Sequence, residues 1–582
     1  MFRFSPETGA WTPRQPNMPA GTENAVMLKT GAQIVAECLL EQGVDTVFGY
    51  PGGAVLNIYD ALYEYQDRIR HVLTAHEQGA AHAADGYARA TGKTGVVIAT
   101  SGPGATNLVT GIATAYMDSV PLVAITGNVA TDLLGRDSFQ EVDITGITMP
   151  VTKHNFIVKN VADLAPVLRK AFRIAGSGRP GPVLVDIPKD VTADRWEYEP
   201  CRPVSALQPQ LPDEAGLEQA VQMISAARRP LLYAGGGVIA SGASQQLTEF
   251  AEKIQCPVCT SLMGLGGFAG NHPLFVGMVG MHGAYETGKA VDECDLLIVA
   301  GARFSDRVAG DRKRFGSGAR ILQLDIDEAE VDKNVAVTHA LVGDLKQLLQ
   351  ALKQRVPQAE HKQWLARIAA WRDSWPKQEK QGQNTPSVTH ILRTLRGLTG
   401  EYDIIATDVG QHQMWTAQTY RFLHPRTLLT SGGLGTMGYG LGAAIGAQVA
   451  FPDKRVALVT GDGSFHMNLN ELVTLSSYRL PVVIVLLNNT VLGMVRQWQK
   501  LFYERRFSQT DPHRQTDFVA LAHAFGLEGM CITQDSQVEP ALRWAFDSRR
   551  PVILDFRISP DDNVLPMIPP GGTTEQMITQ MD

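Results

Sequence analysis

The sequence has few cysteines, no long apolar run and no dense cluster of basic residues. Its six cysteines are scattered over 582 residues, so a disulfide framework is not expected. Cys256 and Cys259 make a lone CxxC pair without the second pair that a zinc site needs, which predicts two buried thiols, with a redox pair as the alternative. No stretch of about 18 residues is apolar and uncharged, so no membrane span is expected. A net charge of -7 without a Lys/Arg run argues against nucleic acid as a partner.

The first 28 residues lack the marks of a targeting segment. They are rich in Pro, Gly and polar residues and have no apolar core of the kind found in secretory signals. Glu7 and Glu23, together with a composition that is not rich in Arg and Ser, fit an organelle transit peptide poorly. We therefore expect residues 1–28 to be a flexible arm on a cytoplasmic protein.

Short apolar segments alternate with helical patterns in three blocks. Residues 29–192 contain TVFGY, GVVIAT, PLVAIT and PVLVDIP, residues 205–355 contain PLLYAGGGV, DLLIVAGAR and RILQLDID, and residues 389–560 contain DIIATDVG, RVALVTGDG, LPVVIVLLNN and PVILDFRI. Such alternation predicts three α/β domains, each a doubly wound parallel sheet covered on both faces. Residues 356–388 are expected to form a linker, and residues 561–582 a C-terminal tail.

Two neighbouring strands of the third block end in polar residues. The strand predicted at 456–460 runs into Asp462 within a GDGS turn, and the strand predicted at 482–487 runs into Asn489. In a right-handed βαβ unit these ends lie at one edge of the sheet. A carboxylate and an amide oxygen suit Mg²⁺ or Ca²⁺ and not zinc, with phosphate oxygens and water completing the shell. The alternative is a pair of ordinary turns, since GDG and NN are both common turn sequences.

A helix with very small side chains is predicted to start at Glu77, in HEQGAAHAADGYARATGK. Ala80, Ala81, Ala84 and Ala88 recur at helical spacing and give a flat face, which lets another backbone or a planar ring approach closely. Taken alone, Glu77 could be a first-turn carboxylate that interacts favourably with the helix dipole.

The GDG–NN arrangement resembles the signature of thiamin diphosphate (ThDP) enzymes. The segments FGYPGGAVL, SGPGATNL, FQEVDI, SGRPGPVLVDIPKD, GMHG, TDVGQHQMW, GGLGTMGYG and GMVRQW, with the Glu77 segment, are similar to catalytic (large) subunits of acetohydroxyacid synthases, also called acetolactate synthases. The resemblance implies decarboxylation of pyruvate and carboligation to a second 2-keto acid, pyruvate or 2-ketobutyrate. The products would be 2-acetolactate or 2-aceto-2-hydroxybutyrate, in valine, leucine and isoleucine biosynthesis.

The resemblance assigns ThDP-binding roles to residues of the first and third blocks. Glu77 would hydrogen-bond the pyrimidine ring, Met437 would hold the cofactor bent, and Gly435 would offer it a backbone acceptor. Mg²⁺ would be held by Asp462, Asn489 and the backbone oxygen of Val491. The remaining residues of the diphosphate region would be Val409, Gly410, Gln411, His412, Gly463 and Ser464.

In this family the cofactor lies between the first domain of one subunit and the third domain of another. The resemblance therefore implies a homodimer or homotetramer, with the flat helix after Glu77 at that contact between subunits.

The substrate pocket is assigned by the same resemblance. Gln140 and Gly53 would line the active site, and Lys189 could attract an anionic substrate or be an ordinary solvated lysine. The alternative for Gln140 is a surface-loop residue.

Arg307 and Trp498 would select the second keto acid. Arg307 offers a bidentate match to a carboxylate, and Trp498 an apolar wall beside it. Asp306 would orient Arg307, while Met281 and Met494 would add apolar lining. The alternatives are a surface ion pair for Arg307 and a core aromatic for Trp498.

The second block carries a Gly-rich turn after a strand, which can receive a pyrophosphate but lacks the full GxGxxG spacing. The resemblance implies an FAD site there, with a structural flavin because acetolactate formation involves no net redox change. The residues assigned to it are Arg179, Gly235, Gly236, Gly237, Ser261, Leu262, Met263, His282, Gly301, Ala302, Arg303, Asp325, Ile326 and Asp344.

No regulatory domain is recognised after residue 560, and the resemblance implies a separate regulatory small subunit. Two other functions remain open from the sequence. One is a pyruvate oxidase-like enzyme that passes electrons to FAD, against which Arg307 and Trp498 argue. The other is a non-catalytic scaffold subunit, against which Glu77, Asp462 and Asn489 argue.

Overall fold

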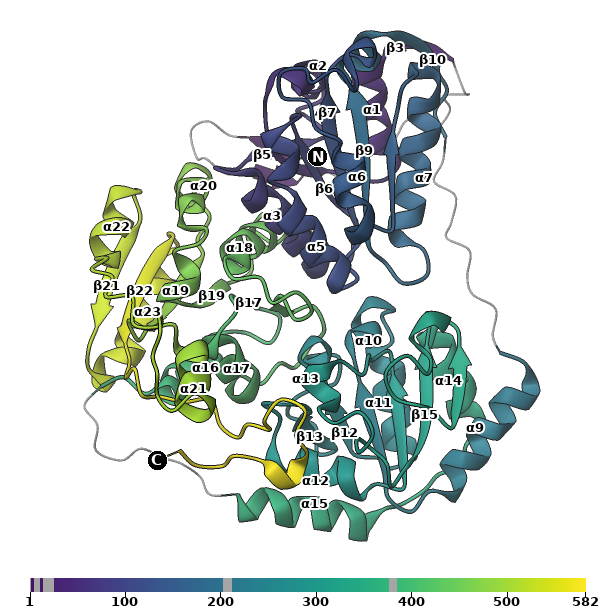
Figure 1. The fold of residues 1–582 in the computed structure, drawn as a ribbon, viewed down its shortest axis with the longest axis vertical. Coiled ribbons are helices and arrows are strands. Elements are labelled where there is room, and N and C mark those ends of the chain that lie inside the picture. The colour runs from purple at the N-terminus through teal and green to yellow at the C-terminus, as the bar shows by residue number, and fades with distance from the viewer. Residues whose placement is uncertain (1, 5–10, 14–25, 202–211, 376–384, 582) are drawn as a thin grey trace.

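The computed structural model describes residues 2–4, 11–13, 26–201, 212–375 and 385–581. Three domains lie around a common centre, each with a six-stranded sheet (Figure 1). Every strand pair within these three sheets is parallel. The predicted fold class of three parallel-sheet α/β domains is thereby confirmed. Among the described helices, none has both the length and the apolar character that crossing a membrane requires.

The first domain has the strand order β5-β4-β6-β7-β9-β8. Alternate residues of strand β6 face opposite sides of the sheet. Val96 and Ile98 pack with helices on one side, and Val97 and Ala99 pack with helices on the other side. The strands are β4 (Thr46–Tyr50), β5 (Arg70–Leu73), β6 (Gly95–Ala99), β7 (Leu122–Asn128), β8 (His154–Ile157) and β9 (Pro182–Pro188). The main helices are α1 (Gly31–Glu41), α2 (Leu56–Glu64) and α7 (Leu164–Gly176) on one face, with α3 (Glu77–Thr91) and α5 (Val109–Met117) on the other.

A short antiparallel pair extends the first domain beyond its expected limits. Strand β3 (Met27–Thr30) pairs with β10 (Arg195–Tyr198). Residues 27 and 28, expected in the arm, and residues 195–198, beyond the expected boundary at 192, therefore belong with this domain. Within the arm, β1 (Phe2–Phe4) and β2 (Trp11–Pro13) also form an antiparallel pair; residues 14–25 lie outside the described part.

The central domain has the strand order β13-β12-β11-β14-β15-β16. Part of the expected linker is the helix α15 (Lys362–Ser374), which packs on this domain: the indole of Trp364 donates to the Pro230 carbonyl at 2.9 Å. Cys256 and Cys259 are free and buried, as expected. The strands are β11 (Pro230–Ala234), β12 (Val258–Thr260), β13 (Phe275–Met278), β14 (Leu296–Ala300), β15 (Arg320–Asp325) and β16 (His339–Val342). The larger helices are α9 (Glu214–Ala226), α11 (Ser244–Lys253), α12 (Tyr285–Glu293) and α14 (Leu345–Arg355).

The third domain has the strand order β18-β17-β19-β20-β22-β21. Its strands are β17 (Ile404–Thr407), β18 (Leu428–Leu429), β19 (Val456–Gly461), β20 (Val483–Asn488), β21 (Glu528–Ile532) and β22 (Val552–Arg557). Its helices include α16 (Val388–Leu398), α17 (Gln411–Thr419), α18 (Tyr439–Ala450), α19 (Asp462–Phe465), α20 (Leu472–Tyr478), α21 (Gly493–Phe502), α22 (Phe518–Ala524) and α23 (Val538–Ser548). The yellow tail then crosses to the central domain (Figure 1), where the Ile568 amide donates to the Met281 carbonyl at 2.8 Å.

Helix α3 packs against α18 of the same chain on the side that carries His82 and Gly86, whereas Ala81 and Ala84 of the predicted flat face lie against Gly111 and Gly95 of the first domain. A Cβ placed at Gly86 would lie 2.5 Å from the Ala443 Cα, and one at Gly442 would lie 2.7 Å from the His82 Cβ. Alanines of both helices share one buried core. The resemblance placed this face at the contact between subunits. The structure corrects that expectation for Ala81 and Ala84, which are buried inside the first domain, and the neighbouring side of the helix lets the third domain of the same chain approach.

Candidate active site

Four strands of the first domain lead to predicted site residues. Gly53 follows β4, Glu77 follows β5, Gln140 follows β7 and Lys189 follows β9. The strands are parallel, so these residues come from the same edge of the sheet. Gln140 lies against the turn after β6, since a Cβ at Gly102 would fall 2.8 Å from the Gln140 carbonyl oxygen.

Glu77 is the first residue of α3, and its carboxylate is half-buried and oriented. The Asn107 amide donates to Glu77 Oε2 at 3.0 Å. A Cβ at Gly104 would lie 3.2 Å from Glu77 Oε1, so the glycine leaves room beside that oxygen. Asn107 belongs to the SGPGATNL segment, to which the sequence assigned no individual role. Its amide lies 30 positions from Glu77 along the chain, and only the fold brings the two together.

The other first-domain residues differ in exposure. Gln140 is half-buried and adopts φ 59°, a left-handed conformation that is uncommon outside glycine. Gly53 opens a short 3₁₀ turn (Gly53–Val55) and is exposed, and a Cβ added there would meet nothing within 4 Å. Lys189 is exposed at the start of α8 (Lys189–Ala193). A ligand above this edge would therefore meet one oriented carboxylate and a glutamine whose backbone is held in a left-handed conformation.

Asp462 and Asn489 lie side by side at the corresponding edge of the third domain. Strands β19 and β20 pair in register up to Gly461 and Leu487, one and two residues before them. The backbone amide of Asn489 donates to the Asp462 carboxylate. The Asn489 side chain donates to Gln411 Oε1 at 3.1 Å and accepts from the Val491 amide at 3.2 Å.

Two buried polar atoms at this edge have no hydrogen-bond partner among the described residues: Asp462 Oδ1 and His412 Nε2. Burial raises the pKa of Asp462 to about 6 and lowers the pKa of His412 to about 3, so the imidazole is neutral. An unpaired buried carboxylate oxygen is costly unless a cation or a donor reaches it. The donor set of Asp462 and Asn489 therefore fits Mg²⁺, and the neutral His412 beside it fits a phosphate-binding region.

A cation here would depend on ligands other than side chains. The described residues contain no group of three or more His, Cys, Asp or Glu side chains that could hold a metal ion. Backbone oxygens, such as that of Val491, together with phosphate and water, would have to complete the shell.

The remaining residues assigned to ThDP follow β17 and β19 or lie in the loop before α18. Gln411 begins α17 and donates to Gln497 Oε1 at 3.1 Å, while Gly463 and Ser464 belong to α19. Gly435 is exposed with φ 72°, and Met437 is half-buried two residues later. Val409 and Gly410 directly precede α17.

Arg307 and Trp498, from the central and third domains, form one contact. The Arg307 guanidinium carbon lies 5.6 Å from the centre of the indole ring, a cation–π arrangement. Arg307 Nη1 lies 3.8 Å from the Met281 sulfur, and Nε lies 3.9 Å from an Asp306 oxygen. With 59% of its side chain exposed, Arg307 is open to an incoming anion. Met494 instead packs, partly buried, against the third-domain core.

A cavity of about 240 Å³ adjoins this contact. Its lining includes Met281, Asp306 and Arg307 from the central domain and residues 568–569 and 572–575 from the C-terminal tail. The tail, expected only as a terminal segment, thus shapes the surroundings of the predicted substrate residues.

Apart from Arg179, which belongs to the first domain, the residues assigned to FAD follow or end strands of the central sheet at its carboxyl edge. A Cβ at Gly237 would lie 2.7 Å from the Gly301 Cα, and one at Gly235 would lie 2.5 Å from the Ala302 Cα, so the turns after β11 and β14 touch. A Cβ at Gly236 would lie 3.3 Å from the Met263 Cβ, and Asp325 ends β15. His282 is buried, its Nδ1 has no partner among the described residues, and burial lowers its pKa to about 4.

Several residues assigned to FAD already have protein partners. Arg179 donates to Glu330 at 2.6 Å and to Ser119 at 2.8 Å, and Arg303 donates to the Met117 carbonyl at 2.7 Å. Asp344 and Ser261 cap α14 and the 3₁₀ turn Leu262–Gly264, respectively. Ile326 directly follows β15. For the side chains with such partners, these contacts within the protein are enough to explain the presence of the residue without a bound flavin.

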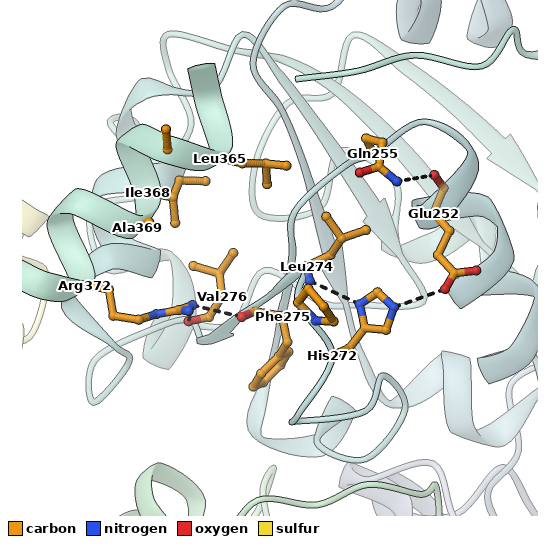
Figure 2. A pocket seen from close by; sticks show the side chains of 12 residues that line it. Glu252, Gln255, His272, Leu274, Phe275, Val276, Leu365, Ile368, Ala369 and Arg372 are labelled. Carbon is orange, nitrogen blue, oxygen red and sulfur yellow. Dashed lines mark hydrogen bonds and ion pairs between the residues drawn. The ribbon is translucent and has the colours of Figure 1, made fainter. Parts of the chain in front are cut away.

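A larger cavity, of about 560 Å³, lies away from all of these residues (Figure 2). It is formed between α15 and the segment 272–276 of the central domain. His272, which contacts Glu252 at 3.2 Å, and Arg372, which donates to the Phe275 carbonyl at 2.9 Å, mark its two sides. It contains none of the predicted site residues.

Comparisons with known proteins find matches in all three domains. Residues 29–147, 217–352 and 408–556 match the N-terminal TPP binding, central and C-terminal TPP binding domains of thiamine pyrophosphate enzymes. The chain is 47% identical over 567 residues to the acetolactate synthase large subunit of Parasynechococcus marenigrum (strain WH8102), covering 95% of this chain and 92% of that protein. It is 47% identical over 551 residues to the acetolactate synthase isozyme 2 large subunit of Escherichia coli (strain K12), covering 95% and 100%. It is 46% identical over 564 residues to a probable acetolactate synthase large subunit of Methanocaldococcus jannaschii, covering 94% and 95%.

Proposed function

Because the chain belongs to the acetolactate synthase large-subunit family of thiamine pyrophosphate enzymes, we propose that it condenses two 2-keto acids at a site formed by Glu77 and the β19–β20 edge. The family produces 2-acetolactate and its homologue for branched-chain amino acid biosynthesis. In this proposal pyruvate is decarboxylated first, and the remaining two-carbon unit joins pyruvate or 2-ketobutyrate.

The observation that carries the proposal is the buried Oδ1 of Asp462, which has no hydrogen-bond partner in the described part of the chain. Asp462, Asn489 and the Val491 carbonyl would hold Mg²⁺, which in turn would hold the diphosphate of ThDP. When bound, ThDP supplies a carbon nucleophile for the keto-acid carbonyl and accepts the negative charge left by the loss of CO₂. The neutral imidazole of His412 and the hydroxyl of Ser464 would contribute hydrogen bonds to the diphosphate region.

Glu77 would exchange a proton with the pyrimidine ring of the cofactor. Asn107 supports this role because it donates to one carboxylate oxygen and so limits the rotation of the side chain. Gln140, held at φ 59° beside Gly102, would orient the keto acid through its amide. Exposed Lys189 would attract the anionic substrate to the entrance.

Arg307 and Trp498 would bind the second keto acid. The guanidinium is exposed, and Asp306 lies at 3.9 Å, so its charge remains available to a carboxylate. The indole beside it would contact the alkyl group of the substrate. A single methylene in such a pocket is worth about 1–3 kcal/mol, which would favour 2-ketobutyrate over pyruvate.

The proposal includes a structural FAD in the central domain. The close approach of the turns after β11 and β14, and the His282 Nδ1 that no described residue contacts by a hydrogen bond, support a bound ligand at that edge. We further propose a cytoplasmic homo-oligomer that works with a separate small subunit, since the relatives are named large subunits.

A competition assay tests the proposal. The protein is supplied with ThDP, Mg²⁺, FAD, pyruvate and 2-ketobutyrate, and both acetohydroxy acids are quantified; Glu77→Gln is the control. We expect both products from the wild type and at least about a hundredfold less from the variant, as for loss of a general acid–base group. Flavin reduction by pyruvate without oxygen, in place of these products, would favour the oxidase alternative. Cofactor binding with no reaction would favour a scaffold.

A further inference from the structure

A buried carboxylate of the third domain holds the backbone that leads into Glu77. Glu471 ends the 3₁₀ turn Leu469–Glu471 and is fully buried. Its Oε2 accepts from the Ala75 amide at 3.1 Å, and its Oε1 accepts from the His76 amide at 3.0 Å. The Thr474 hydroxyl also donates to Oε2, at 2.6 Å. One side chain thus fixes two consecutive amides directly before Glu77.

The helix beneath this carboxylate is shaped to admit it. A Cβ at Gly79 would overlap the Glu471 side chain and lie 2.7 Å from its Cγ. Glycine therefore provides space that any other residue would fill. This explains one of the small residues after Glu77 by a contact different from the α3–α18 packing.

The hydrogen bonds of Glu471 act on the backbone directly before Glu77. His76 is the N-cap of α3 and Glu77 its first residue, so the amides at 75 and 76 determine where the Glu77 side chain leaves the backbone. Hydrogen bonds to a buried carboxylate are stronger than neutral ones. Burial raises the pKa of Glu471, and the nearby charge of Glu77 raises it further, while the two backbone donors and Thr474 lower it.

We propose that Glu471 is a positioning residue for Glu77: it orients the proton-exchanging carboxylate through the backbone of Ala75 and His76. Because Glu471 follows Asp462 by nine positions, the segment that begins with the proposed Mg²⁺ ligand also supports the Glu77 of its own chain. The inference rests on the function proposed for Glu77.

Hydrogen exchange of the cofactor-free, full-length protein tests the contact itself. Glu471→Gln removes the charge, and Gly79→Ala displaces the carboxylate from the opposite side. Thr474→Val is the matched control, since Thr474 bonds the same carboxylate but neither amide. We expect exchange at Ala75 and His76 to accelerate about tenfold or more in the first two variants, as for loss of a charge-assisted hydrogen bond, with Thr474→Val close to wild type.

Deuterium exchange at C2 of ThDP, measured by NMR after an acid quench and without substrate, tests the link to Glu77. We expect it to slow about tenfold or more in Glu471→Gln and Gly79→Ala, with cofactor affinity kept within about threefold. Variants that match wild type in either exchange would overturn the positioning role. If the wild-type protein neither bound ThDP nor catalysed deuterium exchange at C2, the proposed function would be overturned. This result concerns the wild type alone and can be distinguished from a difference between wild type and variants.

Discussion

Replacing Asp462 by Asn should abolish Mg²⁺-dependent ThDP binding without destabilising the cation-free protein. Most buried aspartates stabilise the fold through their hydrogen bonds. Asp462 differs because its Oδ1 has no partner among the described residues and burial raises its pKa from 3.8 to about 6. The charged form is therefore unfavourable in the folded state until a cation arrives.

The size of the effect follows from the pKa difference between the unfolded and folded states. At about 1.4 kcal/mol per pH unit, a rise in the pKa of Asp462 from 3.8 to about 6 lowers the free energy of unfolding by about 3 kcal/mol. The pKa of Asp462 is higher in the folded state than in the unfolded state. The resulting loss of stability is therefore absent below about pH 4, grows as the pH rises and is complete above about pH 6. Asparagine keeps the shape and one acceptor oxygen and carries no charge at any pH.

Calorimetry in EDTA between pH 4 and pH 8 measures this loss of stability. For a domain of this size, 1 kcal/mol shifts the unfolding midpoint by about 2–4 °C. We expect the third-domain midpoint of Asp462→Asn to exceed that of wild type by several degrees at pH 7.5, with the difference vanishing near pH 4. Addition of Mg²⁺ and ThDP should raise the midpoint of the wild type alone.

Asp408→Asn is the matched control in the same domain. Asp408 is also buried with a raised pKa, but it accepts from the Gly440 amide at 2.9 Å and the Thr460 hydroxyl at 2.8 Å. Its replacement should lower the midpoint in EDTA. If Asp462→Asn lowered the midpoint equally, the unpaired-oxygen argument would be refuted.

Three further substitutions probe the packing and the substrate contacts. Gly86→Ala should destabilise the protein by about 1–3 kcal/mol, seen as a lower denaturation midpoint, because a Cβ there would lie 2.5 Å from the Ala443 Cα; an unchanged midpoint would contradict the close helix contact. Trp498→Ala should reduce the preference for 2-ketobutyrate over pyruvate about tenfold in the product ratio, and an unchanged ratio would remove the indole from the pocket. Arg307→Lys should raise the KM for the second keto acid about tenfold, with kcat less affected, because a lysine lacks the bidentate fork; equal KM values would show that Arg307 does not bind the carboxylate.

The order of strands and helices made a large part of the fold predictable. Alternating apolar segments indicated parallel sheets, and the right-handed βαβ rule placed the residues after β19 and β20 at one edge, where Asp462 and Asn489 lie. The same rule places Gly53, Glu77 and Lys189 at one edge of the first sheet. These inferences depend only on local pattern and chain direction.

Contacts between distant segments were not predictable in this way. The small residues of α3 indicated close neighbours, but not that these are α5 and β6 of the first domain on one side and α18 of the same chain on another. Likewise, no local sequence signal ties Glu471 to Ala75 and His76. The separations along the chain are 396 and 395 positions. The contact of the tail with Met281 was also missed, since the apolar residues of the tail show no periodicity.

The most direct test of a shared site is recovery of activity by mixing two inactive variants. Glu77→Gln and Asp462→Asn chains are co-purified with different tags, so that hybrid dimers form. If each site takes Glu77 from one chain and Asp462 from the other, one site of every hybrid is intact, and hybrids isolated through both tags have about half of wild-type activity. If both residues of a site come from one chain, every site carries a defect and the hybrids stay inactive, which would contradict the site between subunits that the family resemblance implies.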